Sequence, residues 1–232
     1  MERQSLILVP GLICDDEVWR YTADRLADIA DCTIVPADTA DTMQRMAADV
    51  LATAPGQFAI AGFSMGGYVA TEVLRQAPDR VTRLALLDTS SRIDSPQKAA
   101  ARRQTIADCE GGRYDAVIDG FVPQLLHPDR MTEALADRVR AMGHRVGAAT
   151  FARRHRAMLT RSAPQDVLSA FAGPVRVIMG RSDQLTSYEE HRELADWPPH
   201  GRLSLIEDCG HMPPLERPQA ATALLRDWLL YD

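Results

Sequence analysis

The stretch Gly62-Phe63-Ser64-Met65-Gly66-Gly67 decides the fold of this chain. It follows an apolar run over residues 58–62 that predicts a strand, and it opens a run over residues 65–76 whose pattern predicts a helix. A serine exposed at such a sharp turn needs neighbours almost free of side chains, and glycine stands two places before and two places after Ser64. We interpret the stretch as a turn that presents a nucleophilic hydroxyl, with an ordinary glycine-rich turn as the alternative.

Short runs of β-branched residues alternate with helical patterns on both sides of this turn. Such alternation is typical of strand–helix–strand units in a mostly parallel sheet that is covered on both faces. The predicted strands are residues 5–9, 33–36, 58–62, 84–88, 175–180 and 203–206, and the predicted helices around them are residues 18–30, 43–53, 65–76, 189–196 and 214–230. The predicted fold class is therefore α/β, with a doubly wound sheet of about six strands.

Helical patterns continue between residues 91 and 173, but the alternation with strands stops there. We therefore assign residues 1–90 and 174–232 to one α/β core and residues 91–173 to a helical insertion in that core. A chain of 232 residues is long enough for one such core with an insertion.

The composition is that of an ordinary globular protein, with 46% apolar and 25% charged residues. The formal net charge of −6 disfavours binding to nucleic acid and to an anionic membrane surface. The sequence has no apolar run of the roughly 18 residues that a membrane helix needs, and we expect no signal peptide. We expect a cytoplasmic monomer or homodimer.

Neither a metal nor an organic cofactor is expected, because no histidine and carboxylate cluster has ligand spacing and no phosphate-binding loop is present. The four cysteines are scattered without close pairing, so free thiols are expected at Cys14, Cys32, Cys109 and Cys209. Cys14 lies in the loop after the first strand, where a reactive thiol is the alternative to an inert, packed one.

A serine hydroxyl is a poor nucleophile until a base takes its proton, so Ser64 needs a histidine and an acid that orients it. His211 follows the last predicted strand, and Asp183 follows the strand over residues 175–180. Because parallel strands deliver their following loops to one edge of the sheet, we predict that Ser64, Asp183 and His211 meet there. The remaining histidines, which we expect at the solvated surface, are His127, His144, His155, His191 and His200.

Asp88 ends the strand over residues 84–88 and is an alternative candidate for the acid. Otherwise, its carboxylate caps the chain that follows by accepting hydrogen bonds from free backbone amides.

Acyl transfer also needs hydrogen-bond donors for the developing oxyanion, commonly two backbone amides. The amide of Met65, directly after the serine, is one candidate. The other is the amide of Leu12, because Gly11 allows the loop after the first strand to bend inward.

With these residues identified, the chain resembles the α/β-hydrolase superfamily over nearly its whole length, in particular the small-capped group with carboxylesterases and enol-lactone hydrolases. The motifs that carry the resemblance are Pro10-Gly11 with Trp19, Gly62 to Gly67, Gly180-Arg181-Ser182-Asp183, and Gly210-His211 with Glu216 and Pro218. The resemblance implies that residues 91–173 form a cap over the site and that Ser64, Asp183 and His211 are the catalytic triad.

Apolar residues of the implied cap and of the loops near the triad are candidates for the substrate pocket, with core packing as the alternative for each. They are Ile13, Phe63, Phe121, Leu125, Phe151 and Leu185, with Trp19 as a further candidate. A basic cluster in the implied cap consists of Arg153, Arg154, His155, Arg156 and Arg161. This cluster either binds a carboxylate or phosphate of the substrate or forms a solvated helix face.

The function expected from these residues is hydrolysis of a small ester, lactone or thioester through an acyl-enzyme on Ser64. Two alternatives stay open, because a fold does not fix the reaction. One is a non-hydrolytic enzyme with the same triad, such as a lyase, a cofactor-free oxygenase or a perhydrolase. The other is a ligand-binding protein with a slow triad.

Overall fold

The computed structural model describes residues 3–232, which form a six-stranded sheet in the order β2-β1-β3-β4-β5-β6. Every neighbouring pair of strands in it is parallel. The strands are β1 (Gln4–Val9), β2 (Ala30–Ile34), β3 (Phe58–Phe63), β4 (Val81–Leu87), β5 (Val175–Gly180) and β6 (Gly201–Ile206). The predicted α/β class and the six parallel strands are confirmed.

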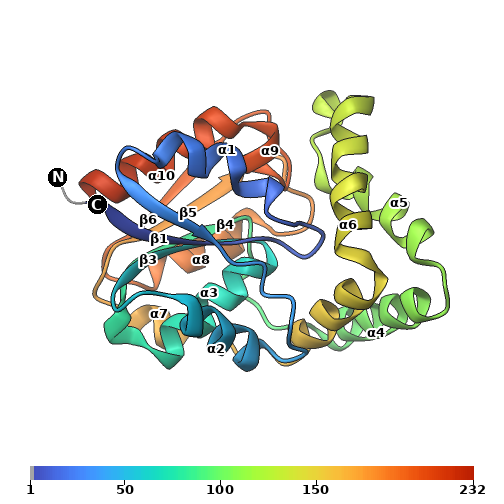
Figure 1. Ribbon diagram of the computed structural model, residues 1–232, viewed down its shortest axis with the longest axis horizontal. Helices are drawn as coiled ribbons and strands as arrows, with labels where there is room; N and C mark the ends of the chain where they lie inside the picture. Colours follow the sequence, from blue (N-terminus) through green and yellow to red (C-terminus); the bar gives the residue numbers. More distant parts are fainter. Residues whose placement is uncertain (1–2) are drawn as a thin grey trace.

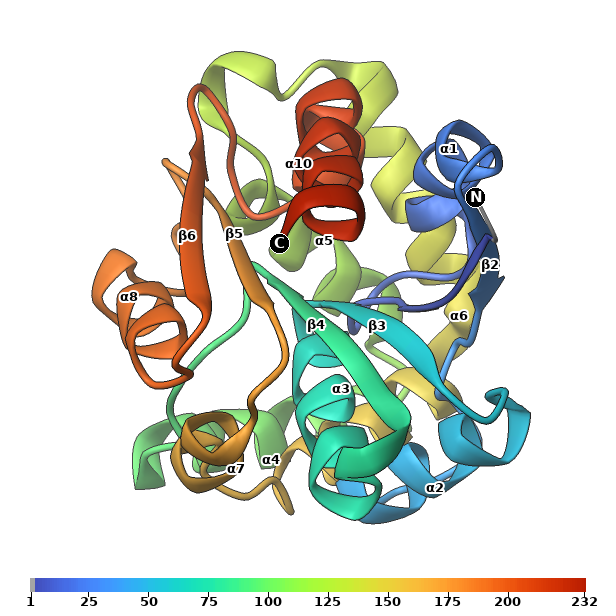
Figure 2. The same cartoon turned by 90° about the vertical axis from the view of Figure 1, so that its left-hand side faces the viewer.

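Helices cover both faces of the sheet (Figures 1 and 2). On one face lie α1 (Glu17–Leu26), α9 (Pro213–Glu216) and α10 (Pro218–Tyr231), and on the other lie α2 (Met43–Thr53), α3 (Met65–Gln76), α7 (Gln165–Ala170) and α8 (Tyr188–Asp196). Short 3-10 helices span Pro78–Arg80 and Pro128–Arg130. The helices bury apolar stripes against the strands, as α10 does with Ala221, Leu225, Trp228 and Leu229.

Four sequence predictions were wrong at element boundaries, and one of them is the strand predicted over residues 84–88, which begins at Val81. The helix predicted over residues 18–30 ends at Leu26, and the strand predicted over residues 33–36 begins at Ala30. Only alternate residues of this edge strand approach the core, so it lacks the continuous apolar run of the central strands.

The helix predicted over residues 214–230 is two helices, α9 and α10. They are separated at Arg217, whose φ of −134° and ψ of 55° are not helical. Pro218 explains the break, because the ring of a proline disfavours the helical conformation in the residue before it.

Three long helices of the segment between β4 and β5 stand beyond the carboxyl ends of the strands (Figure 1). They are α4 (Pro96–Glu110), α5 (Tyr114–Leu125) and α6 (Glu133–Met158), and we call them the cap helices. α6 is kinked at Gly147, which has a φ of 76°. None of the helices within residues 3–232 is long and apolar enough to cross a bilayer.

The topology of the sheet marks the position of a binding site. β1 lies between β2 and β3, so the chain adds one strand on one side of β1 and the next strand on its other side. In open α/β sheets, ligands bind outside the carboxyl ends of the strands where the strand order reverses in this way. Val9 and Gly62 are paired at that point, so the loops after β1 and β3 leave the sheet side by side.

Candidate active site

The turn after β3 holds Ser64 in a strained conformation, with a φ of 53° and a ψ of −115°. A Cβ atom at Gly62 would lie 2.2 Å from the carbonyl oxygen of Gly66, and one at Gly66 would lie 2.1 Å from that of Val9. The backbone amide of Ser64 donates to the carbonyl of Leu87 at 2.8 Å. The turn is therefore tight because two glycines allow it, and its bond to β4 fixes its direction.

Ser64, His211 and Asp183 come together at the carboxyl edge of the sheet, from the loops after β3, β6 and β5. The distance from Nε2 of His211 to Oγ of Ser64 is 2.9 Å, and that from Nδ1 of His211 to Oδ2 of Asp183 is also 2.9 Å. The side chains of His211 and Asp183 are 3% and 0% exposed. Solvent therefore has little access to the contact between the acid and the imidazole.

Asp183 is held as an anion. Burial opposes the ionisation of Asp183, but the charge and the hydrogen bond of His211 outweigh this effect. Hydrogen bonds from Thr186 and Leu185 act in the same direction as His211. Together they keep the pKa of Asp183 below its usual range. The amide of Leu185 donates to its Oδ1 at 2.8 Å, and the hydroxyl of Thr186 donates to its Oδ2. A carboxylate only accepts hydrogen bonds, so Nδ1 of His211 carries a proton and Nε2 is free to accept one from Ser64.

The loop that carries His211 is fixed by hydrogen bonds to α5 and to the buried carboxylate of Glu216. The backbone amide of His211 donates to the carbonyl of Leu125 in α5 at 2.9 Å. Glu216 accepts hydrogen bonds from the amides of Met212 at 3.0 Å and of His127 at 2.8 Å. Phe63 packs beside the imidazole, with ring centroids 5.5 Å apart.

The two amides expected to bind an oxyanion are in the loops after β1 and β3. Neither the N–H of Leu12 nor that of Met65 has a hydrogen-bond acceptor within residues 3–232. Met65 begins α3, so its amide is one of the donors that a helix leaves free at its start. Within the described residues, both amides therefore remain donors without an acceptor.

Arg154 holds the Leu12 loop from α6, a role that sequence reasoning missed. Its guanidinium donates to the carbonyl of Leu12 at 2.8 Å, to that of Cys14 at 2.9 Å and to that of Pro36 at 2.9 Å. Arg154 is 1% exposed. The alternative of a solvated helix face is therefore wrong for this residue.

Asp88, the alternative acid, is completely buried next to Asp183. Its Oδ1 accepts a hydrogen bond from the amide of Gly180 at 2.9 Å. Burial, and then the charge of Asp183, raise its pKa well above the usual range. Asp88 thus ties the end of β4 to β5, and it makes no hydrogen bond with His211 within the described chain.

A cavity of about 310 Å³ lies in front of Ser64 and His211. Six of the predicted pocket and oxyanion residues line it: Leu12, Ile13, Phe63, Phe121, Leu125 and Leu185. Phe151 and Trp19 do not, because both are buried in the core, where Phe151 packs behind Phe121 with ring centroids 5.8 Å apart. Lining residues that sequence reasoning missed include Tyr68, Lys98, Arg102, Thr105 and Met158, whereas His155 and Arg161 belong to the basic cluster that the sequence singled out.

The expectation of solvated histidines was wrong at two positions. His155 and His191 are buried, whereas His144 and His200 are exposed. Burial, followed by the charge of Arg102, lowers the pKa of His155 to about 3, so its imidazole is neutral. Neither ring nitrogen of His155 has a hydrogen-bond partner within residues 3–232.

Asp88, Asp183 and His211 are the one group in the described chain whose ligand atoms lie close enough to share a metal ion, within 4.8 Å of one another. Asp88 already accepts from the Gly180 amide through one carboxyl oxygen, and Asp183 binds the imidazole. Burial also raises the pKa of Asp88 well above its usual range, which disfavours the anionic form that a metal ion requires. The group fits proton transfer better than metal binding.

Comparison with known proteins gives consistent matches. Residues 29–218 match the model of a family described as alpha/beta hydrolase fold. A pimeloyl-[acyl-carrier protein] methyl ester esterase of Aromatoleum aromaticum is 27% identical over 210 residues, which are 80% of this chain and 79% of that relative. A putative non-heme bromoperoxidase BpoC of Mycobacterium tuberculosis is 30% identical over 202 residues, 80% of this chain and 74% of that relative.

Solved structures agree over almost the whole chain. A thermophilic esterase from Thermogutta terrifontis superposes with a TM-score of 0.88 at 27% identity, covering 97% of this chain and 89% of that one. The enol-lactonase from Burkholderia xenovorans LB400 superposes with a TM-score of 0.89 at 21% identity, covering 99% of this chain and 92% of that one. At that identity, the second likeness concerns the fold alone.

Proposed function

The chain belongs to the alpha/beta hydrolase fold family, and within it we propose that the protein is a serine esterase acting on a small carboxylic ester, lactone or thioester. The observation that carries the proposal is the pair of 2.9 Å contacts that links Oγ of Ser64 through His211 to Asp183. Relatives named as pimeloyl-[acyl-carrier protein] methyl ester esterases support ester hydrolysis.

The proposed reaction has two steps. His211 takes the proton of Ser64 through Nε2 while Oγ attacks the ester carbonyl, and the imidazolium that forms is stabilised by Asp183. The amides of Leu12 and Met65 donate to the oxyanion, and the alcohol leaves with the proton from His211. Water, deprotonated by His211, then cleaves the acyl-enzyme and restores the Ser64 hydroxyl.

A fluorophosphonate probe with mass-spectrometric mapping tests this proposal, because such a probe reacts with an activated serine. We expect prompt labelling of Ser64 in the folded protein and none in the heat-unfolded protein. Ser64→Ala should lose labelling and nearly all turnover of p-nitrophenyl acetate, whereas Ser204→Ala, in β6 and outside the cavity lining, should keep both. Turnover retained in Ser64→Ala, with an unchanged circular dichroism spectrum, would refute the proposal.

A second candidate, perhydrolysis, is favoured by the similarity to the putative bromoperoxidase. In it, hydrogen peroxide instead of water attacks the acyl-enzyme, which releases a peracid and restores the Ser64 hydroxyl. Bromination of monochlorodimedone in the presence of acetate, peroxide and bromide measures this reaction. Ser64-dependent bromination faster than ester hydrolysis would favour perhydrolysis, and slower bromination would favour the esterase.

A further inference from the structure

The charged side chains that line the cavity are all cationic. They are Lys98 and Arg102 of α4 and Arg161, which follows α6, and no aspartate or glutamate is among the lining residues. The whole chain has a net charge of −6, so a cationic wall differs from the average surface. A cavity whose wall carries one sign of charge concentrates ligands of the opposite sign.

Arg161 is the most deeply placed of the three cations, with a side chain that is 5% exposed. Its Nε and Nη2 donate to the carbonyl of Arg92 at 3.1 and 2.7 Å, and Nη2 also contacts Oδ1 of Asp94 at 2.9 Å. The guanidinium lies over the ring of Tyr68, 4.4 Å from its centroid. These contacts hold the guanidinium in one orientation beside the cavity.

One donor group of Arg161 is left over. Its Nη1 is buried and has no hydrogen-bond partner within residues 3–232. A buried donor without an acceptor is costly and uncommon in folded proteins.

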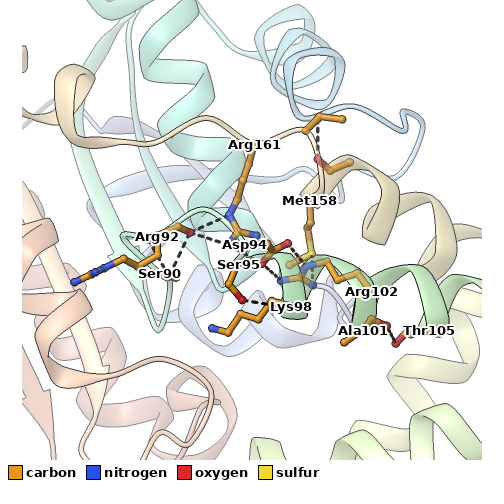
Figure 3. Close-up of polar contacts among 12 residues, drawn as sticks. Ser90, Arg92, Asp94, Ser95, Lys98, Ala101, Arg102, Thr105, Met158 and Arg161 are labelled. Atoms are coloured by element: carbon orange, nitrogen blue, oxygen red, sulfur yellow. Dashed lines mark hydrogen bonds and ion pairs between the residues drawn. The ribbon is translucent and has the colours of Figure 1, made fainter.

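Asp94 neutralises only part of the positive charge that Arg102 and Arg161 bring to the cavity wall. Arg102 contacts it through Nε at 2.6 Å, and Arg161 contacts it from a second side (Figure 3). Burial opposes the ionisation of Asp94, but the hydrogen bonds and charges of the two arginines outweigh burial and keep its pKa below the usual range. Two guanidinium groups therefore share one carboxylate, and one positive charge remains.

Lys98 adds a second positive charge that is not neutralised. It lies one turn before Arg102 on α4, so both side chains lie on the same side of the helix. Its ammonium group has no ion pair within the described residues, and Figure 3 shows its side chain extending away from the pair formed by Asp94 and Arg102. The lysine is exposed, which suits a role at the cavity mouth.

We propose that Lys98, Arg102 and Arg161 form a carboxylate subsite, and that the preferred substrate is a small ester that also carries a free carboxylate. This inference rests on the proposed esterase function. The ester group lies at Ser64 and the carboxylate lies against the cationic wall, which attracts it through the positive charge that Asp94 leaves unneutralised. Of the basic cluster singled out in the sequence, Arg161 is the arginine that lines the cavity.

The first test compares esters of matched length that differ in charge. Values of kcat/KM are measured for monomethyl adipate and for methyl hexanoate, with acetoxyhexanoate and hexyl acetate as a second pair in which the carboxylate is on the alcohol side. We expect the charged member of at least one pair to be favoured by about tenfold or more, which corresponds to about 1.4 kcal/mol. The favoured pair identifies the side of the ester that carries the carboxylate, and the preference should decrease with added salt.

Variants assign the preference to the subsite. Arg161→Met and Lys98→Met should each reduce the charged-to-neutral ratio by at least about threefold. Arg103→Met is the matched control, because Arg103 is an exposed cation of α4 that does not line the cavity, and it should leave the ratio unchanged. Lys98 is at the surface, so Lys98→Met keeps the test decisive if Arg161→Met fails to fold.

The outcomes separate this inference from the proposed function. Hydrolysis of charged and neutral esters at equal kcat/KM would overturn the subsite and leave the esterase standing. If the wild-type protein hydrolyses none of the esters, the proposed function fails, and calorimetric binding of adipate and hexanoate decides the subsite. Tighter binding of adipate that Lys98→Met weakens would support it, and equal affinity would overturn it.

Discussion

Asp88 and Asp183 place their carboxyl groups within 4.8 Å of each other, and both lie within that distance of a ring nitrogen of His211. The pKa of Asp183 is lowered below its usual range, whereas burial and the neighbouring charge raise that of Asp88. Two adjacent buried carboxyl groups seldom both ionise, because their charges repel each other in a medium of low dielectric. The negative charge is therefore carried by the carboxyl group that contacts the imidazole.

The two carboxyl groups should respond differently to replacement by an amide. Asp183→Asn removes the charge that stabilises the imidazolium, so kcat for p-nitrophenyl acetate should fall by roughly 10⁴-fold, as in other serine triads. Asp88→Asn replaces a neutral acid with a neutral amide that still accepts from the Gly180 amide, and it should retain kcat within about fivefold. The opposite ranking would make Asp88 the orienting acid.

Arg154→Met should reduce kcat for p-nitrophenyl acetate although it leaves Ser64, Asp183 and His211 unchanged. The variant removes the donors that hold the carbonyls of Leu12 and Cys14, so the Leu12 amide loses its fixed position. Loss of one oxyanion donor lowers kcat by roughly 100-fold to 1,000-fold, and we expect a decrease of at least about tenfold. Arg156→Met, at the exposed neighbour that pairs with Glu110, is the control and should keep kcat. An unchanged kcat in Arg154→Met would remove the Leu12 loop from the mechanism.

Gly66→Ala should be strongly destabilising. Its Cβ would overlap the carbonyl of Val9 at 2.1 Å, and Val9 belongs to β1, whose backbone is fixed by the sheet. We expect the free energy of unfolding to decrease by about 3 kcal/mol in urea denaturation. Gly120→Ala, inside α5 with no atom within 4 Å of the new Cβ, should instead add up to about 1 kcal/mol. Equal effects would mean that the turn relaxes easily.

His155 should make the folded state sensitive to acid. The folded protein keeps its imidazole neutral down to about pH 3, whereas the unfolded chain binds a proton near pH 6.5. The contribution of the neutral His155 to the unfolding free energy is therefore complete above about pH 6.5. It is lost as the pH falls toward 3, since the unfolded state then binds more protons. In His155→Leu, the decrease in unfolding free energy from pH 7 to pH 5 should be smaller by about 2 kcal/mol. Equal decreases in both proteins would contradict the assignment.

Cys14 should be inert although it borders the cavity. Burial, only partly offset by the charge of Arg154, raises the pKa of its thiol to about 12, so the thiolate is rare at pH 8. Ellman's reagent should modify Cys14 slowly in the native protein and rapidly after unfolding in guanidinium. Rapid native modification, mapped to Cys14 by mass spectrometry, would revive the alternative of a reactive thiol.

The core and the turn at Ser64 could be predicted because their signals are local. The apolar strands and the glycines at positions 62 and 66 are required by the backbone itself, whichever residues surround them. The break at Arg217 was missed, although its signal is local as well, since Pro218 disfavours a helical conformation in the residue before it.

The environments of the cap residues could not be predicted in the same way. Arg154 and His155 are polar residues in a helix, a pattern typical of a solvated face. They are buried because the Leu12 loop and the aromatic ring of Phe151 cover them. Likewise, the pairing of Arg102 and Arg161 with Asp94 depends on how α4 packs on α6, which periodicity does not specify.

Helix α5 lines the cavity, and its Leu125 carbonyl also accepts a hydrogen bond from the His211 amide. The same helix therefore contributes to the cavity wall and to the position of the His211 loop. If α5 swings outward to admit a ligand, it takes away an acceptor that positions the His211 loop. Entry of the substrate by that route and readiness for proton transfer are then opposed. A shortened protein without the segment between β4 and β5 would keep the three reactive residues in its sequence yet lose the support of the imidazole loop.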